Sequence, residues 1–154
     1  MKASLLAILL LIGGCAPAIV KPVTPFNDAD FAAYTKKGSA SVHGQAFMKT
    51  NGGDVKYGAG NNVLLIPATR YSEEALTILD EGGYVIIKID PEWNKYTKTT
   101  QADATGNFEF SDLPAGDYFL ECAITWSTGE SRTGGLLRKK ITLANSQSLK
   151  IILN

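Results

Sequence analysis

The sequence predicts an all-β domain, a two-sheet Greek-key sandwich of seven to eight strands with one or two short helices. From residue 38 onward, short apolar and β-branched stretches are separated by turns rich in Gly, Asn, Asp and Pro. The regular alternation of strands with long helices that a parallel sheet requires is missing. A chain of 154 residues also has the size of one domain.

The N-terminus resembles a bacterial lipoprotein signal. Lys2 precedes a largely apolar run over residues 3–12, and two glycines stand directly before Cys15. The ten residues of that run are about half of the roughly 20 needed to span a bilayer core, which argues against an uncleaved membrane helix. An ordinary secretory signal cut near residues 16–18 is a further alternative.

The resemblance to lipoprotein signals implies a lipid anchor. Residues 1–14 would be removed as a signal peptide, and Cys15 would carry a diacylglyceryl group and a fatty acid such as palmitate on its new N-terminus. Two or three acyl chains hold a protein on a membrane for long periods. Ala16 after the cysteine is similar to lipoproteins of the Gram-negative outer membrane. We therefore expect a cell-envelope protein that faces the periplasm.

Residues 15–38 are expected to form a tether and a short helix. Pro17, Pro22 and Pro25 exclude a regular helix or a central strand in the first part. After them, Asn27 or Asp28 can cap a helix on which Phe31 and Tyr34 share a face, and Gly38 ends it. The aromatic pair is expected to pack on the domain.

Residues 39–154 are expected to form the sandwich itself. The segment 63–67 is apolar on both faces, which is typical of a central strand. One helix interrupts the strands, with Ser72 as its cap, Leu76 and Leu79 facing inward, and two glycines at its end. The predicted strands cover about ten residues around 41–48, then 63–67, 84–89, 96–102, 107–110, 117–126, 136–143 and 149–153.

The run from Ala102 to Tyr118 (ADATGNFEFSDLPAGDY) resembles the signature of carboxypeptidase regulatory-like domains, and 42–45 and 63–67 also match that family's pattern. The resemblance covers roughly residues 40–153 and implies a transthyretin-like (prealbumin-like) sandwich rather than an activity. Elementary chemistry explains the signature as a turn. Asp103 accepts hydrogen bonds within it, Gly106 takes a positive φ, and Tyr118 enters the core.

The composition gives no sign of catalysis or nucleic-acid binding. Fifteen basic residues balance fifteen acidic ones, and the basic run 138–140 is expected to be a solvated edge. His43 is the only histidine, on the polar side of a strand, so we expect no catalytic triad, no metal site and no cofactor. Cys122 is expected to be a buried small hydrophobe. A weak calcium site at Asn51, Asp54 and Asn61 is the one metal alternative.

Trp93 and Tyr96 are the candidate binding residues. They lie in a polar turn, where an aromatic pair can stack on a glycan or anchor a protein partner. The alternative is that both rings seal the edge of the sandwich. The sequence thus predicts a membrane-anchored, non-enzymatic binding or assembly module whose partner is an unknown envelope protein or glycan. The alternatives are a glycan- or peptidoglycan-binding protein and a secretion-apparatus lipoprotein with a transthyretin-like fold.

Overall fold

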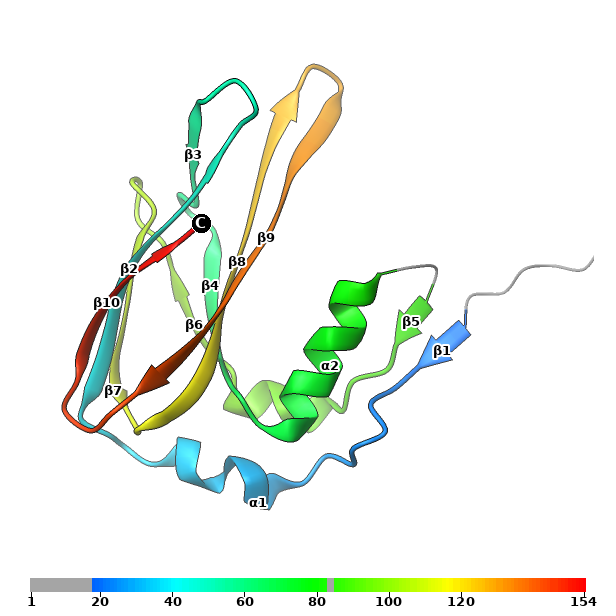
Figure 1. Cartoon of the computed structure of the whole chain (residues 1–154), viewed down its shortest axis with the longest axis vertical. Coiled ribbons are helices and arrows are strands. Elements are labelled where there is room, and N and C mark those ends of the chain that lie inside the picture. Colours follow the sequence, from blue (N-terminus) through cyan, green and yellow to red (C-terminus); the bar gives the residue numbers. More distant parts are fainter. Residues whose placement is uncertain (1–17, 83–84) are drawn as a thin grey trace, which may run out of the picture.

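The computed structural model describes residues 18–82 and 85–154, in which strands dominate and a few helices cover one side (Figure 1). The predicted signal peptide and Cys15 lie outside the described residues. Within the described residues, no helix is long and apolar enough to cross a membrane.

The elements follow one another in a fixed order. They are β1 (Ala18–Val20), α1 (Asp28–Phe31), the 3₁₀ helix η1 (Ala32–Thr35), β2 (Ala40–Lys49), β3 (Val55–Tyr57), β4 (Asn62–Pro67), α2 (Arg70–Glu81), β5 (Val85–Ile87), the 3₁₀ helix η2 (Pro91–Tyr96), β6 (Lys98–Gln101), β7 (Asn107–Leu113), β8 (Gly116–Thr128), β9 (Ser131–Leu143) and β10 (Ser148–Leu153).

Two four-stranded sheets face each other across one core. The β2 sheet contains β10, β2, β7 and β3, and in it β7 and β3 pair with successive parts of β2. The β4 sheet has the strand order β6-β4-β8-β9. Alternate side chains of each strand point inward. The buried strand residues of this core are Ala40, Val42, Ala46, Phe108, Phe110, Leu113 and Leu153 from the β2 sheet, and Val63, Leu65, Tyr118, Leu120, Cys122, Ile124, Leu137, Ile141 and Leu143 from the β4 sheet; Ala102, directly after β6, joins them.

A second core lies on the opposite face of the β4 sheet. Helix α2 packs there, because Tyr71, Ala75 and Leu76 point toward Ile66 of β4. Strand β4 therefore contributes Val63 and Leu65 to one core and Ile66 to the other. The prediction of a central strand that is apolar on both faces is confirmed.

The start of α2 differs from the prediction. Thr69, not Ser72, is the N-cap: its hydroxyl accepts a hydrogen bond from the Ser72 N–H at 3.2 Å. The Ser72 side chain instead points into the second core. Leu79 is 44% exposed, so the prediction that it faces inward is wrong. The last turn of α2 lies over a charged contact with the sheet rather than over apolar side chains.

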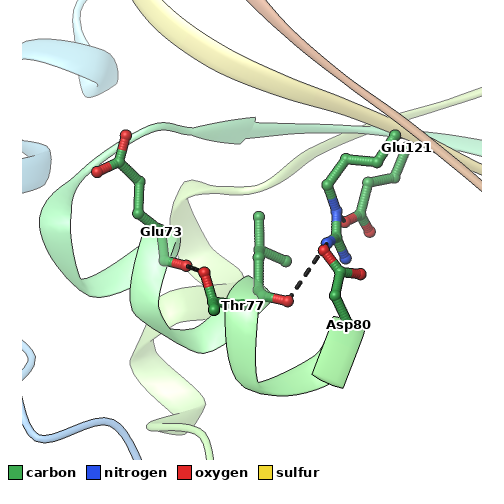
Figure 2. Close-up of polar contacts among 6 residues, drawn as sticks. Glu73, Thr77, Asp80 and Glu121 are labelled. Carbon is green, nitrogen blue, oxygen red and sulfur yellow. Dashed lines mark hydrogen bonds and ion pairs between the residues drawn. The ribbon is translucent and has the colours of Figure 1, made fainter. Parts of the chain in front are cut away.

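That charged contact corrects another prediction. Arg138 was expected on a solvated edge, but its side chain is only 13% exposed. The guanidinium pairs with Glu121 of the neighbouring strand and with Asp80 of α2, and it donates to the Leu76 carbonyl at 3.3 Å. Figure 2 shows Asp80, on the last turn of the helix, facing Glu121 on the sheet. Lys139 and Lys140 are exposed, as predicted for the run.

The predicted short helix is confirmed, with Asn27 as its cap: its side chain accepts from the Ala29 N–H at 3.1 Å. The two aromatic side chains of this segment reach different cores. Phe31 is fully buried in the second core, whereas Tyr34 packs edge-on against Tyr118 of the first at 5.1 Å between ring centroids. The segment therefore joins the two cores.

The signature turn forms as its chemistry predicts. The Asp103 carboxylate accepts hydrogen bonds from the side chain and backbone N–H of Asn107, and also from the side chain and backbone N–H of Thr105. These hydrogen bonds lower the Asp103 pKa to about 2. Gly106 has φ +80°, and a Cβ there would lie 2.5 Å from the Ala46 carbonyl oxygen. At the next corner, the Tyr118 hydroxyl donates to the Pro114 carbonyl at 2.9 Å.

Cys122 is buried in the first core, as predicted. Burial raises the pKa of its thiol, which disfavours the reactive thiolate. The residue therefore acts as a small apolar side chain.

Candidate functional site

Trp93 does not offer a ring to a ligand. It lies in η2, is 7% exposed, and its indole Nε1–H donates to the Ser72 hydroxyl at 3.0 Å. The ring also contacts Tyr71 edge-on at 6.2 Å. The prediction that the Trp93 ring is open to a glycan or a protein partner is wrong, because the polar turn around it folds over the second core.

Tyr96 closes the same core from the outside. Its half-buried ring stacks on Phe31 at 4.7 Å, and its hydroxyl donates to the Asp28 carboxylate at 2.5 Å. That hydrogen bond to a carboxylate raises the Tyr96 pKa. Both residues thus follow the alternative in which the aromatic rings seal an edge.

Replacing Trp93 with phenylalanine is expected to lower the free energy of unfolding by about 1–2 kcal/mol. The substitution keeps most of the buried apolar surface but removes the indole donor to Ser72. Urea unfolding measures the effect, and Tyr96→Phe, which loses only an exposed hydrogen bond, is the control. An unchanged midpoint for Trp93→Phe would contradict a structural role for this hydrogen bond.

A different surface gathers polar and aromatic side chains from several strands. We call it the outer β2 face, the side of the β2 sheet that points away from the core. Its residues are Ser41, His43, Gln45 and Phe47 of β2, Tyr57 of β3, Asn107 and Glu109 of β7, and Lys150 and Ile152 of β10. The alternation of strand side chains places these residues on one side, opposite the buried ones.

The strand register arranges these side chains in rows. His43 stands between Lys150 and Glu109, with 3.7 Å between its Nδ1 and the Glu109 carboxylate. Its other ring nitrogen lies 3.2 Å from the Ser41 hydroxyl. The row therefore presents an ammonium, an imidazole and a carboxylate side by side on a partly exposed surface.

The next row carries two amides and an exposed apolar side chain. Gln45 pairs with Asn107 on one side and with Ile152, 51% exposed, on the other. The Gln45 amide donates to the Thr105 carbonyl at 2.9 Å, which fixes its orientation. Asn107 is similarly held by Asp103 at 3.0 Å. These contacts preorganise the polar groups of the row.

A groove of about 760 Å³ runs along these rows. Besides residues of the outer β2 face, Thr100 and Gln101 of β6 and Asp103 of the signature turn line it. Hydroxyl, amide and carboxylate groups therefore converge on one hollow that is open to solvent. Such groups orient a polar ligand by hydrogen bonding.

An aromatic pair continues the outer β2 face beyond the groove. Phe47 and Tyr57 are partners across β2 and β3, with ring centroids 6.4 Å apart and planes at 68°. Tyr57 is 45% exposed, and the neighbouring Val55 is 41% exposed. Aromatic rings bind apolar ligand faces, and nearby hydrogen-bonding groups bind hydroxyls. A sugar chain carries both kinds of surface.

The sequence contains two signals for this face, and the first is Tyr57, which, like Trp93 and Tyr96 but less strongly, stands out as an aromatic residue in a polar segment. Phe47 is in phase with Ser41, His43 and Gln45, so an aromatic residue occupies a position where the strand pattern calls for a polar one. The part of the chain that the structure describes contains no group of three or more His, Cys, Asp or Glu side chains placed to hold a metal ion.

No protein-family model and no curated protein matches the chain. Among solved structures, the chain is similar to a "putative carbohydrate binding protein" from Pseudomonas aeruginosa, with 24% identity and a TM-score of 0.73 over 84% of this chain and 97% of that one. It also aligns with BcpA, the major pilin subunit of Bacillus cereus, with 16% identity and a TM-score of 0.44 over 76% of this chain and 30% of that one. The first likeness concerns the fold.

Proposed function

We propose that the chain is a non-enzymatic binding module of the bacterial cell envelope that binds a glycan on the outer β2 face and is tethered through lipid on Cys15. The main observation in favour of glycan binding is the Phe47–Tyr57 pair. It lies on the same face of the sheet as the preorganised polar groups. The Pseudomonas aeruginosa protein described as a "putative carbohydrate binding protein" has a similar fold, which supports this choice of ligand.

A binding role without catalysis suits the groups on this face. His43 and Glu109 are both exposed to solvent, with 45% and 61% of their side chains accessible. A general acid or base is usually set in a desolvated site that shifts its pKa. The row of charged groups instead supports hydrogen bonding to a ligand that stays partly hydrated.

We also propose a transthyretin-like Greek-key topology of the carboxypeptidase regulatory-like type. The chain passes between the two sheets after β3, β6, β7 and β9, which supports a Greek-key connection. The Asp103–Gly106 turn and the Tyr118 corner lie in the segment that resembles that family.

The anchor predicts a simple change in location. In cells, Cys15→Ser is expected to abolish lipidation and move the protein from the membrane fraction to the soluble periplasmic fraction. Metabolic labelling with a fatty acid analogue and fractionation measure both effects, and Cys122→Ser, a change at the buried thiol, is the control. Continued membrane residence with residues 1–14 uncut would contradict the anchor.

Glycan binding is tested by sedimentation of the purified protein with peptidoglycan sacculi and with insoluble cellulose and chitin. The proposal expects specific retention by at least one of them and competition by its soluble fragments. A protein that pellets with none of them, while crosslinking in cells at the outer β2 face to another envelope protein, would replace the glycan role by an assembly role.

A further inference from the structure

The N-terminal strand and a segment after helix α2 form a small ribbon outside the sandwich. Strands β1 and β5 pair in parallel, with Ile19 opposite Ile86. Figure 1 shows this ribbon on the far side of α2 from the two sheets. We propose that the ribbon docks on a membrane surface that carries anionic lipid headgroups. This inference rests on the proposed lipid anchor at Cys15.

The outward face of the ribbon begins with two isoleucines. Ile19 is 71% exposed and Ile86 is 52% exposed, and residues in register on parallel strands share a face. Val23, further along the same segment, is 90% exposed. Exposed apolar side chains gathered in this way are costly in water and gain free energy by entering the headgroup and acyl boundary.

Two lysines follow the isoleucines on the ribbon. The Lys88 N–H donates to the Val20 carbonyl at 2.8 Å, which extends the pairing by one step and brings Lys88 beside Lys21. Both lysines line one hollow of about 560 Å³. Like charges on neighbouring strands repel each other, and anionic headgroups relieve that repulsion.

The hollow offers the lysines little compensation from within the protein. Asp90 is the single acidic residue among those that line it. Its carboxylate already caps η2 by accepting from the Glu92 N–H at 2.9 Å. The pair of ammonium groups is therefore available to an external anion.

Helix α2 holds the segment that directly follows β1. The Glu74 carboxylate accepts from the backbone N–H groups of Val23 at 2.5 Å and Thr24 at 2.9 Å. A hydrogen bond from the Thr24 side chain and these backbone bonds lower the Glu74 pKa, so the carboxylate stays charged. Docking of the ribbon therefore orients the whole domain rather than a loose tail.

The proposed lipid anchor at Cys15 would place a membrane close to the ribbon. Cys15 precedes Ala18 by three residues, so an extended chain separates the lipidated residue from the ribbon by at most about 11 Å. In Figure 1 the β2 sheet and the ribbon lie at opposite sides of the molecule. Docking through the ribbon thus turns the outer β2 face away from the bilayer, where a glycan can reach it.

The test uses the full acylated protein, extracted from membranes and reconstituted into vesicles that contain a quencher on the lipid. A fluorescent label is attached at Ile86→Cys or, for comparison, at Ser131→Cys, the exposed first residue of β9, and the native Cys122 is buried. In phosphatidylethanolamine–phosphatidylglycerol vesicles, the label at position 86 is expected to be quenched several-fold more than the label at 131.

The charge requirement is tested by a pair of matched variants. Lys21→Ser/Lys88→Ser is expected to weaken the docking equilibrium about 25-fold, about fivefold for each lysine. The control is Lys36→Ser/Lys98→Ser, which makes the same charge change on exposed residues outside the ribbon. This control is expected to leave the docking equilibrium unchanged. Phosphatidylcholine vesicles are expected to behave as the first variant does.

The possible failures are distinguishable. A label at 86 that is quenched no more than the label at 131, in protein retained by the vesicles, would overturn docking and leave the anchor standing. Unchanged quenching in Lys21→Ser/Lys88→Ser would also overturn it. Protein that is not retained by any vesicle would overturn the anchor and, with it, the docking.

Discussion

Arg138→Met is expected to lower the free energy of unfolding by about 3–5 kcal/mol, a large fraction of the stability of a small domain. The guanidinium compensates Glu121, which is 6% exposed, and it links the β4 sheet to Asp80 and to the Leu76 carbonyl of α2. Methionine fills a similar volume but leaves the Glu121 carboxylate buried without its cation.

Urea unfolding of three variants separates charge from packing. Lys140→Met, which breaks the exposed pair with Glu73 at 2.6 Å, is expected to cost about 1 kcal/mol or less. The double variant Arg138→Met/Glu121→Leu is expected to recover much of the loss, because no buried charge is left alone. Equal effects of Arg138→Met and Lys140→Met would contradict the buried role of Arg138.

Phe47→Ala/Tyr57→Ala is expected to abolish measurable glycan retention, with at least about a tenfold loss for each ring. Both rings belong to the outer β2 face, and Tyr57 is already 45% exposed, so truncation removes contact surface for a ligand with little cost to the core. Sedimentation of wild type and variants with the retaining polysaccharide measures the change.

The control for the aromatic pair is Leu79→Ala, because Leu79 is exposed to a similar degree, 44%, but lies on α2. It is expected to bind the polysaccharide as the wild type does. Thermal unfolding shows whether each variant remains folded. If the folded Phe47→Ala/Tyr57→Ala variant is still fully retained by the polysaccharide, the aromatic pair is not part of the binding site.

The sequence predicted seven of the eight sandwich strands, those with a periodic pattern. The predicted strand 84–89 is wrong as a sandwich strand, because β5 pairs with β1 outside the two sheets. The alternation over residues 41–48, the doubly apolar segment at 63–67 and the turn chemistry of Asp103 and Gly106 all act locally. The short strands β1 and β3 were missed, because three residues carry too little pattern and their pairing partners are distant or follow a turn.

The errors concern residues whose surroundings come from distant segments. Arg138 belongs to a basic run, and only the arrival of α2 and Glu121 makes its position buried. Trp93 lies among polar residues, yet Ser72 and Tyr71 of α2 fold under it. The outer β2 face likewise arises from strands far apart in sequence, so only two aromatic residues, Phe47 on a polar strand face and Tyr57 in a polar segment, indicated it.

The position of the ligand tests the central claim most directly. We expect that titrating the isotope-labelled protein with soluble oligosaccharides, released from sacculi by a muramidase, shifts backbone amide NMR signals of residues 41–49, 55–57, 107–109 and 148–152. These residues come from the four strands of the β2 sheet, whose alternate side chains form the outer β2 face. The absence of shifts, or shifts confined to residues around Trp93 and Tyr96, would contradict a glycan site on this face.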